Sequence, residues 1–166
     1  MKKIILSEKS LYYGKVEMPK RFEINQKKLS ADIISSIVQK TQFPFSKNLD
    51  MLICYLQEHI QLKYDFSLVQ KNIFGHICKP REKTETFLQV DPVDLRHSPD
   101  YVLLYGVNVK DCDIKIFYND NRRKGRSWDI PLNNNQFVMF PSNLRYNLTN
   151  NSDELSLILT MTFEYI

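Results

Sequence analysis

The sequence predicts an α+β fold in which two helices near the N-terminal end pack on a strand-rich jelly roll. Two segments before residue 60 carry apolar residues at helical spacing, and short β-prone runs divided by turn residues fill the remainder. The chain has 166 residues, of which 43% are hydrophobic, enough to bury one core. We therefore expect a single domain over 1–166, with a strand and two-helix buttress over 1–60 and the core over 61–166.

The N-terminal part predicts two short strands and then two helices. Segments 3–6 and 11–17 are β-prone, and Pro19 follows the second, so both are expected at a sheet edge. Segment 27–40 has the spacing of an amphipathic helix behind a polar start at Asn25. A second helix is expected over 48–59, capped by Ser46 or Asn48. Helices that precede strands in this way favour an α+β arrangement in which they cover one face of a sheet.

The rest of the chain predicts a series of strands. Segment 101–109 is apolar with little alternation, as expected of a central strand covered on both faces. Segments 113–118 and 127–131 predict a hairpin with a basic tip. Many short strands with frequent turns are typical of a barrel or sandwich. The remaining strands are expected over 61–66, 72–79, 84–90, 137–140 and 155–165.

Composition limits the classes of protein. No run approaches the roughly 18 apolar residues of a membrane span, so we expect no membrane association. The charged start of the chain resembles a signal peptide, but its apolar part is only three residues long, which favours a cytoplasmic protein. Cys54, Cys78 and Cys112 form no Cys-x-x-Cys pair, which favours reduced, mostly buried thiols over a metal or redox site. Lys, Asn and Ile are abundant and Gly occurs only four times, as in many phage proteins.

Positive charge is concentrated in two places. The net charge is +4, but residues 1–28 hold eight Lys or Arg against three Glu. The predicted hairpin is also basic, with an aromatic residue beside it. Such surfaces can contact phosphates while an aromatic ring stacks on a base. An open alternative is a solvated hairpin in which Trp128 packs inward and the arginines pair with Asp120 and Asp129. The candidate macromolecule-binding residues are Lys20, Arg21, Arg122, Arg123, Lys124, Arg126 and Trp128.

Four pieces of the last third resemble a known family. They are His97-Ser98-Pro99-Asp100, the strand that ends at Tyr105-Gly106-Val107, the corner Phe140-Pro141-Ser142, and the polar turn 150–154. In this order they are similar to the Fe(II)- and 2-oxoglutarate-dependent oxygenases of phages and marine bacteria. The resemblance covers about 70 residues. It implies a double-stranded β-helix, with residues 61–166 as the β-helix core.

The resemblance also implies a metal site, which this sequence matches only in part. Such an oxygenase needs two His and one carboxylate on iron. In the family an imidazole stands four residues after the corner, where this chain has Tyr146, and a phenol with a pKa near 10 is a poor substitute. The other two ligands would be His97 and Asp100, whose spacing differs from the usual His-x-Asp or His-x-His. The segment from His97 to Asp100 can equally form a β-turn in which Asp100 binds backbone amides.

Two further features of the family pattern are altered or ambiguous. The family places a cation for 2-oxoglutarate on the last strand, where this chain has Leu155 or Ser156, and Arg145 is a displaced alternative. His76 with Asp91 or Asp94 is a different candidate site, although the apolar surroundings of His59 and His76 favour structural histidines.

These observations lead to three functional hypotheses. The first is a phage-encoded, non-catalytic jelly-roll protein without a cofactor, which binds nucleic acid or a host protein such as the transcription machinery through its basic surface. The second is an Fe(II)/2-oxoglutarate-dependent oxygenase with atypical ligands drawn from His97, Asp100 and Tyr146. The third is a structural component of a virion. The sequence leaves the oligomeric state open.

Overall fold

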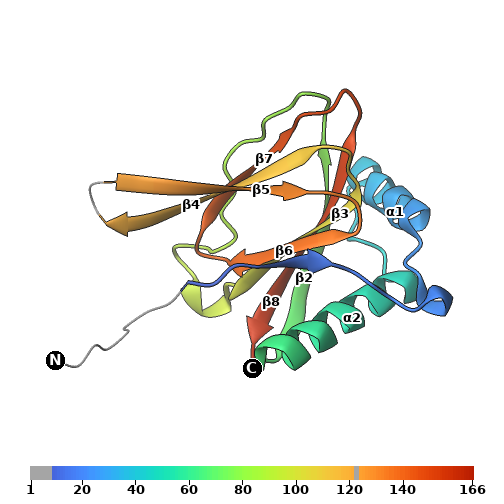
Figure 1. The fold of residues 1–166 in the computed structure, drawn as a ribbon, viewed down its shortest axis with the longest axis horizontal. Helices are drawn as coiled ribbons and strands as arrows, with labels where there is room; N and C mark the ends of the chain where they lie inside the picture. The colour runs from blue at the N-terminus through green and yellow to red at the C-terminus, as the bar shows by residue number, and fades with distance from the viewer. Residues whose placement is uncertain (1–8, 122–123) are drawn as a thin grey trace.

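The computed structural model describes residues 9–121 and 124–166 and shows two helices packed on a jelly roll of two antiparallel sheets (Figure 1). The larger sheet has five strands in the order β1-β6-β3-β8-β2, and the smaller has three in the order β5-β4-β7. The predicted fold class, a double-stranded β-helix with two N-terminal helices on the sheet, is therefore confirmed. The helices are α1 (Gln26–Gln39) and α2 (Lys47–Tyr64), with 3-10 turns η1 (Lys20–Phe22) and η2 (Leu95–His97). The strands are β1 (Tyr12–Lys15), β2 (Leu68–Cys78), β3 (Tyr101–Asn108), β4 (Cys112–Asn121), β5 (Lys124–Leu132), β6 (Gln136–Pro141), β7 (Arg145–Asn150) and β8 (Ser156–Tyr165).

Side-chain caps fix where the two helices begin. Asn25 Oδ1 accepts a hydrogen bond from the Lys28 N–H at 3.0 Å and starts α1. Ser46 Oγ accepts from the Leu49 N–H at 3.2 Å and starts α2, so Ser46 is the cap of the two candidates. Asn48 has another role, because its Oδ1 accepts from the Asn25 N–H at 2.8 Å and ties the starts of the two helices together.

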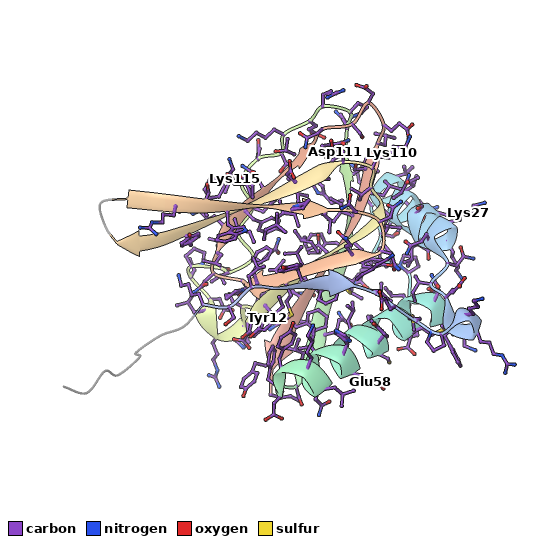
Figure 2. The ribbon with its side chains drawn as sticks, in the orientation of Figure 1. Tyr12, Lys27, Glu58, Lys110, Asp111 and Lys115 are labelled. Atoms are coloured by element: carbon purple, nitrogen blue, oxygen red, sulfur yellow. The ribbon has the colours of Figure 1, made fainter. Side chains whose placement is uncertain are left out.

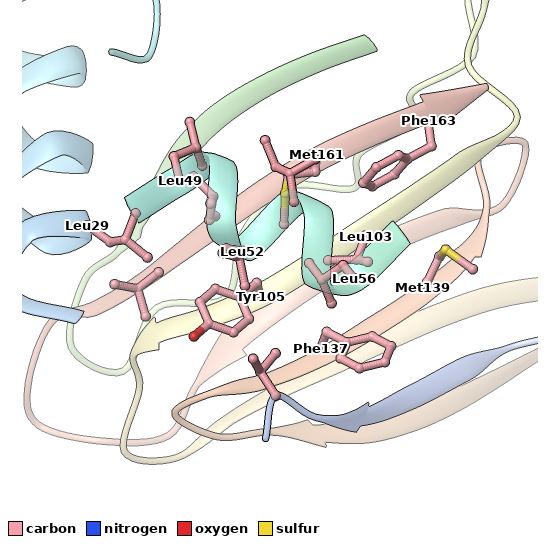
Figure 3. Close-up of a cluster of buried hydrophobic side chains, with 14 of the residues drawn as sticks. Leu29, Leu49, Leu52, Leu56, Leu103, Tyr105, Phe137, Met139, Met161 and Phe163 are labelled. Carbon is pink, nitrogen blue, oxygen red and sulfur yellow. The ribbon is translucent and has the colours of Figure 1, made fainter. Parts of the chain in front are cut away.

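The helices cover one face of the five-stranded sheet. Leu49, Leu52 and Leu56 of α2 point toward the sheet, where they meet a layer of fully buried side chains (Figure 3). α1 packs especially close to β2: a Cβ added at Gly75 would lie 2.6 Å from Ile33 Cγ2. The opposite sides of the helices face outward, as Lys27 and Glu58 show (Figure 2). The sheet residues of this core include Leu103, Tyr105, Phe137, Met139, Met161 and Phe163.

The other face of the five-stranded sheet meets the three-stranded sheet. A second buried cluster fills this space, with Val102, Leu104 and Ile158 from one sheet and Ile114 and Ile116 from the other. β3 lies at the centre of the five-stranded sheet, as its apolar sequence predicted. Two of the three cysteines, Cys78 and Cys112, are buried in this cluster as thiols, while Cys54 is exposed on α2.

Two predicted strands differ from the structure. Segment 61–66 is the last turn of α2 and its cap, because Ile60 remains fully buried on the helix and Asp65 ends it in the left-handed region at φ 56°. Segment 84–90 runs along β7 but makes only isolated bridges, at Lys83 to Thr149 and Phe87 to Tyr146. The predicted strand 3–6 lies outside the described residues. No helix in the described ranges is long and apolar enough to cross a membrane.

Candidate active site

The Phe-Pro-Ser corner connects β6 to β7 and is fixed to the turn before β3. Ser142 is buried, its N–H donates to the Asp100 carbonyl oxygen at 2.9 Å, and its hydroxyl donates to the Pro99 carbonyl oxygen. Two of the four pieces of sequence that carried the family resemblance, His97–Asp100 and Phe140–Ser142, therefore touch each other. Because this contact sets the start of β7, it also determines which β7 side chains point between the sheets.

Tyr146 points into the space between the sheets and is 2% exposed. Its ring packs against Phe87 and Phe140, with centroids 5.4 and 5.2 Å away. Its hydroxyl accepts a hydrogen bond from Gln89 Nε2 at 3.0 Å. Burial raises the pKa of Tyr146 to about 12, while the bond from Gln89 lowers it slightly. The phenol is therefore neutral at pH 7.

His97 and Asp100 do not join Tyr146. Both are exposed residues outside the barrel interior. His97 Nδ1 lies 2.8 Å from an Asp94 carboxylate oxygen, and Asp100 Oδ2 accepts from the Tyr165 N–H at 2.8 Å. Asp100 therefore binds a backbone amide, but that amide belongs to Tyr165 on β8, and residues 95–97 form the 3-10 turn η2 in place of a β-turn over 97–100. The other candidate histidine, His76, packs against Phe87 at 5.2 Å between ring centroids, and burial lowers its pKa.

The side chains present do not fit the usual iron site of two imidazoles and a carboxylate. Across residues 9–121 and 124–166, no three His, Cys, Asp or Glu side chains are grouped so that they could hold a metal ion. The position after the corner offers a phenol, and its hydrogen-bond partner is an amide.

Gln89 is the site residue that the sequence analysis missed. It lies 57 residues before Tyr146 in the chain, and the pairing of segment 84–90 with β7 brings the two together. A signal was present, because Gln89-Val90-Asp91 has the two-residue spacing of the family's His-x-Asp with an amide at the first position. The Asp91 carboxylate accepts from the Val93 N–H at 2.8 Å through Oδ1.

At the positions where a cation for 2-oxoglutarate was expected, no Lys or Arg side chain points into the barrel. Ser156 is fully buried at the start of β8, and its hydroxyl has no hydrogen-bond partner. Leu155 is 50% exposed, and Arg145 is exposed on β7. The buried, unpartnered Ser156 hydroxyl is the polar group at this position that remains available for an interaction.

The candidate macromolecule-binding residues do not form one surface. Lys20 and Arg21 are exposed in η1, which lies at the opposite end of the molecule from the β4–β5 hairpin (Figure 1). On β5, Arg126 is exposed and Trp128 is 63% exposed. Asp129 pairs with Lys115 at 3.4 Å. Lys124 begins β5, while Arg122 and Arg123 lie outside the described residues. A role of these seven residues in binding a macromolecule stays a prediction.

Comparison with known proteins identifies relatives of the fold. No family model and no curated protein matches the sequence. A prolyl-4-hydroxylase from Pseudomonas putida has a similar structure, with a TM-score of 0.63 and 13% identity over 93% of this chain and 85% of that one. The non-heme α-ketoglutarate-dependent carbocyclase SnoK has a TM-score of 0.66 and 6% identity over 94% and 79% of the two chains. A Trichoplax adhaerens prolyl hydroxylase in complex with a hypoxia inducible factor peptide has a TM-score of 0.59 and 7% identity over 93% and 83%.

These relatives correct two expectations. The first hypothesis, a non-catalytic binding protein without a cofactor, is contradicted, because the structural neighbours are Fe(II)/2-oxoglutarate oxygenases. The residues at the corner differ from the usual iron ligands, but this difference alone does not show that the protein is non-catalytic. The chain has the fold of the Fe(II)/2-oxoglutarate-dependent oxygenases.

Proposed function

We propose that this protein is an Fe(II)/2-oxoglutarate-dependent oxygenase with an unusual site at Gln89 and Tyr146. The observation that carries the proposal is the hydrogen bond between the half-buried Gln89 and the buried Tyr146. This bond joins two polar side chains in a region between the sheets that is otherwise filled with apolar side chains. Buried polar groups need compensation, so a site that keeps them suggests a use for them.

The residues of the chain have separate parts in this proposal. Gln89 and Tyr146 would face the metal and offer it an amide oxygen and a phenol oxygen. The bound iron and 2-oxoglutarate would supply the oxidising chemistry. Phe87 and Phe140 pack on the Tyr146 ring, fix its orientation and exclude water. The raised pKa of Tyr146 means that its proton leaves only if a cation compensates for the charge.

The test measures iron binding and 2-oxoglutarate turnover together. Purified protein is incubated with Fe(II), ascorbate and 2-oxoglutarate, and succinate is quantified. We expect iron-dependent succinate release that falls at least about tenfold in Tyr146→Phe and in Gln89→Leu. His97→Ala is the matched control and should keep full turnover, because His97 is exposed and bound to Asp94. The proposal is overturned if the wild-type protein neither retains iron after gel filtration nor releases succinate.

The phage origin and the binding of a host protein or nucleic acid remain predictions from the sequence. The oxygenase proposal requires neither of them.

A further inference from the structure

A long groove lies where the two sheets separate. Its volume is about 1180 Å³, and it runs between β1 and β6 of the larger sheet and β4 and β5 of the smaller one. Figure 1 shows these two strand pairs in separate layers. Sites for small molecules usually measure about 300 to 1,000 Å³, so this groove has room for a segment of a polymer.

The walls of the groove are aromatic and its floor is apolar. Tyr13 of β1 and Trp128 of β5 line it and are 70% and 63% exposed. Ile116, Val138 and Leu144 form part of the floor and are buried. Exposed aromatic side chains over an apolar floor favour binding, because they lose little conformational freedom when a ligand covers them.

Both strands that border the groove are sheet edges. Within the described residues, β1 pairs only with β6, and β5 pairs only with β4. Each strand therefore has one side without a neighbouring strand. An extended polypeptide can add to such an edge, where main-chain hydrogen bonds provide affinity and alternate side chains enter the groove. A nucleic acid has no matching backbone pattern.

The charge of the groove selects for acidic segments. Lys9 and Lys15 line it and are exposed. The carboxylate that lines it, Asp129, is engaged by Lys115 Nζ at 3.4 Å. The groove is therefore net positive, and it would repel a basic segment.

The groove also adjoins the candidate active site. Ile116 lies on its floor and is paired with Tyr146 across β4 and β7. Leu144, another floor residue, is two positions before Tyr146. The floor of the groove thus adjoins the strand position of Tyr146, whose own side chain is buried behind it.

We propose that this groove binds an extended, acidic polypeptide segment, which adds as a strand to the edge of β5 or β1. The inference deepens the proposed function by naming its substrate class. It is tested by binding alone, without iron or 2-oxoglutarate, so that its outcome is separate from the turnover assay.

Trp128 provides the readout, because it is the only tryptophan of the chain. The metal-free protein is titrated with a synthetic peptide of alternating Val and Glu, about ten residues long. We expect a saturable shift of tryptophan emission to shorter wavelengths, weakened by salt. The same peptide with Lys in place of Glu should give no shift. An acidic peptide N-methylated on alternate amides should bind much more weakly, because it cannot donate to the strand edge.

Charge-reversal variants locate the binding. The double variant Lys9→Glu, Lys15→Glu should weaken affinity for the acidic peptide at least about fivefold. The control Lys27→Glu, Lys28→Glu makes the same charge change on α1, away from the hairpin (Figure 2), and should have much less effect. Equal binding of acidic and basic peptides, no response to either, or tighter binding of oligothymidylate would overturn the inference. Peptide binding without succinate release would instead count against the proposed function.

Discussion

The two faces of the five-stranded sheet differ in the polarity of the side chains packed against them. The face under α1 and α2 is a continuous apolar layer, closed over by leucines of α2 and by the tight contact between Ile33 and Gly75. The space between this sheet and the smaller one contains the partly buried Gln89–Tyr146 hydrogen bond, the unpartnered Ser156 hydroxyl and the open groove. The comparison suggests that the helical face supplies most of the stability, which allows the inner face to keep polar groups that cost stability.

Truncating a leucine on the helical face should have the largest effect. Leu52→Ala removes a fully buried side chain between α2 and the sheet, and we expect a loss of about 3 kcal/mol in the free energy of unfolding. Urea denaturation followed by circular dichroism measures it. Val38→Ala is the control, because Val38 is 74% exposed and should change little. A loss below about 1 kcal/mol for Leu52→Ala would show that the helices are not the main source of stability.

Gly75→Ala should separate α1 from the sheet. The added methyl group would lie 2.6 Å from Ile33 Cγ2, so the helix must shift, at a cost of about 1–3 kcal/mol. The double variant Gly75→Ala, Ile33→Ala should lose less stability than the sum of the losses of the two single variants, because the smaller side chain at position 33 leaves room for the added methyl group. Strict additivity in the double-mutant cycle would mean that this contact does not position α1.

On the inner face, Tyr146→Phe should have a smaller effect on stability. The ring contacts with Phe87 and Phe140 remain, but Gln89 Nε2 loses its acceptor, at a cost of about 1–2 kcal/mol. Gln89→Leu in the Tyr146→Phe background should restore stability, because neither polar group is then left unpaired. If Tyr146→Phe were instead stabilising, the Gln89–Tyr146 hydrogen bond would lower the stability of the protein, and activity would be the reason to keep it.

High pH should lower the free energy of unfolding, because two tyrosines are buried in the folded protein. Burial raises the pKa of Tyr105 and of Tyr146 from 10 in the unfolded chain to about 12 in the folded one. Between those values the unfolded state gives up protons that the folded state keeps, so stability is full below about pH 10 and falls toward pH 12. Urea midpoints measured across this range should fall less steeply in Tyr146→Phe. Tyrosinate absorbance at pH 11 that matched full ionisation of every tyrosine in the folded protein would contradict the prediction.

Local patterns predicted the elements well because each is determined by neighbouring residues. The spacing of Leu29 and Ile33 and the cap at Asn25 are enough to predict α1. Segment 61–66 failed because its alternation fits a strand as well as the end of a helix, and only the burial of Ile60 and the contact of Tyr64 with Tyr12 settle it. Short apolar runs are ambiguous for this reason.

The site was less predictable because it depends on contacts between distant parts of the chain. The corner drew attention to position 146 through a short motif, and the structure shows that Tyr146 is buried between the sheets. The spacing of Gln89-Val90-Asp91 was a signal for its partner Gln89, but the contact itself depends on isolated bridges between segment 84–90 and β7, which local patterns do not predict. His97 and Asp100 were chosen for their residue types, yet their side chains are satisfied locally by Asp94 and the Tyr165 amide.

The position of β8 has a consequence for how the chain folds. β8 is the last strand in the sequence, yet it lies between β3 and β2 and pairs with both. During synthesis, β2 and β3 therefore leave the ribosome with exposed edges and apolar faces, and the larger sheet cannot close until residues 156–165 have emerged. Folding should accordingly be slow and late, and nascent chains stalled before β8 should bind chaperones.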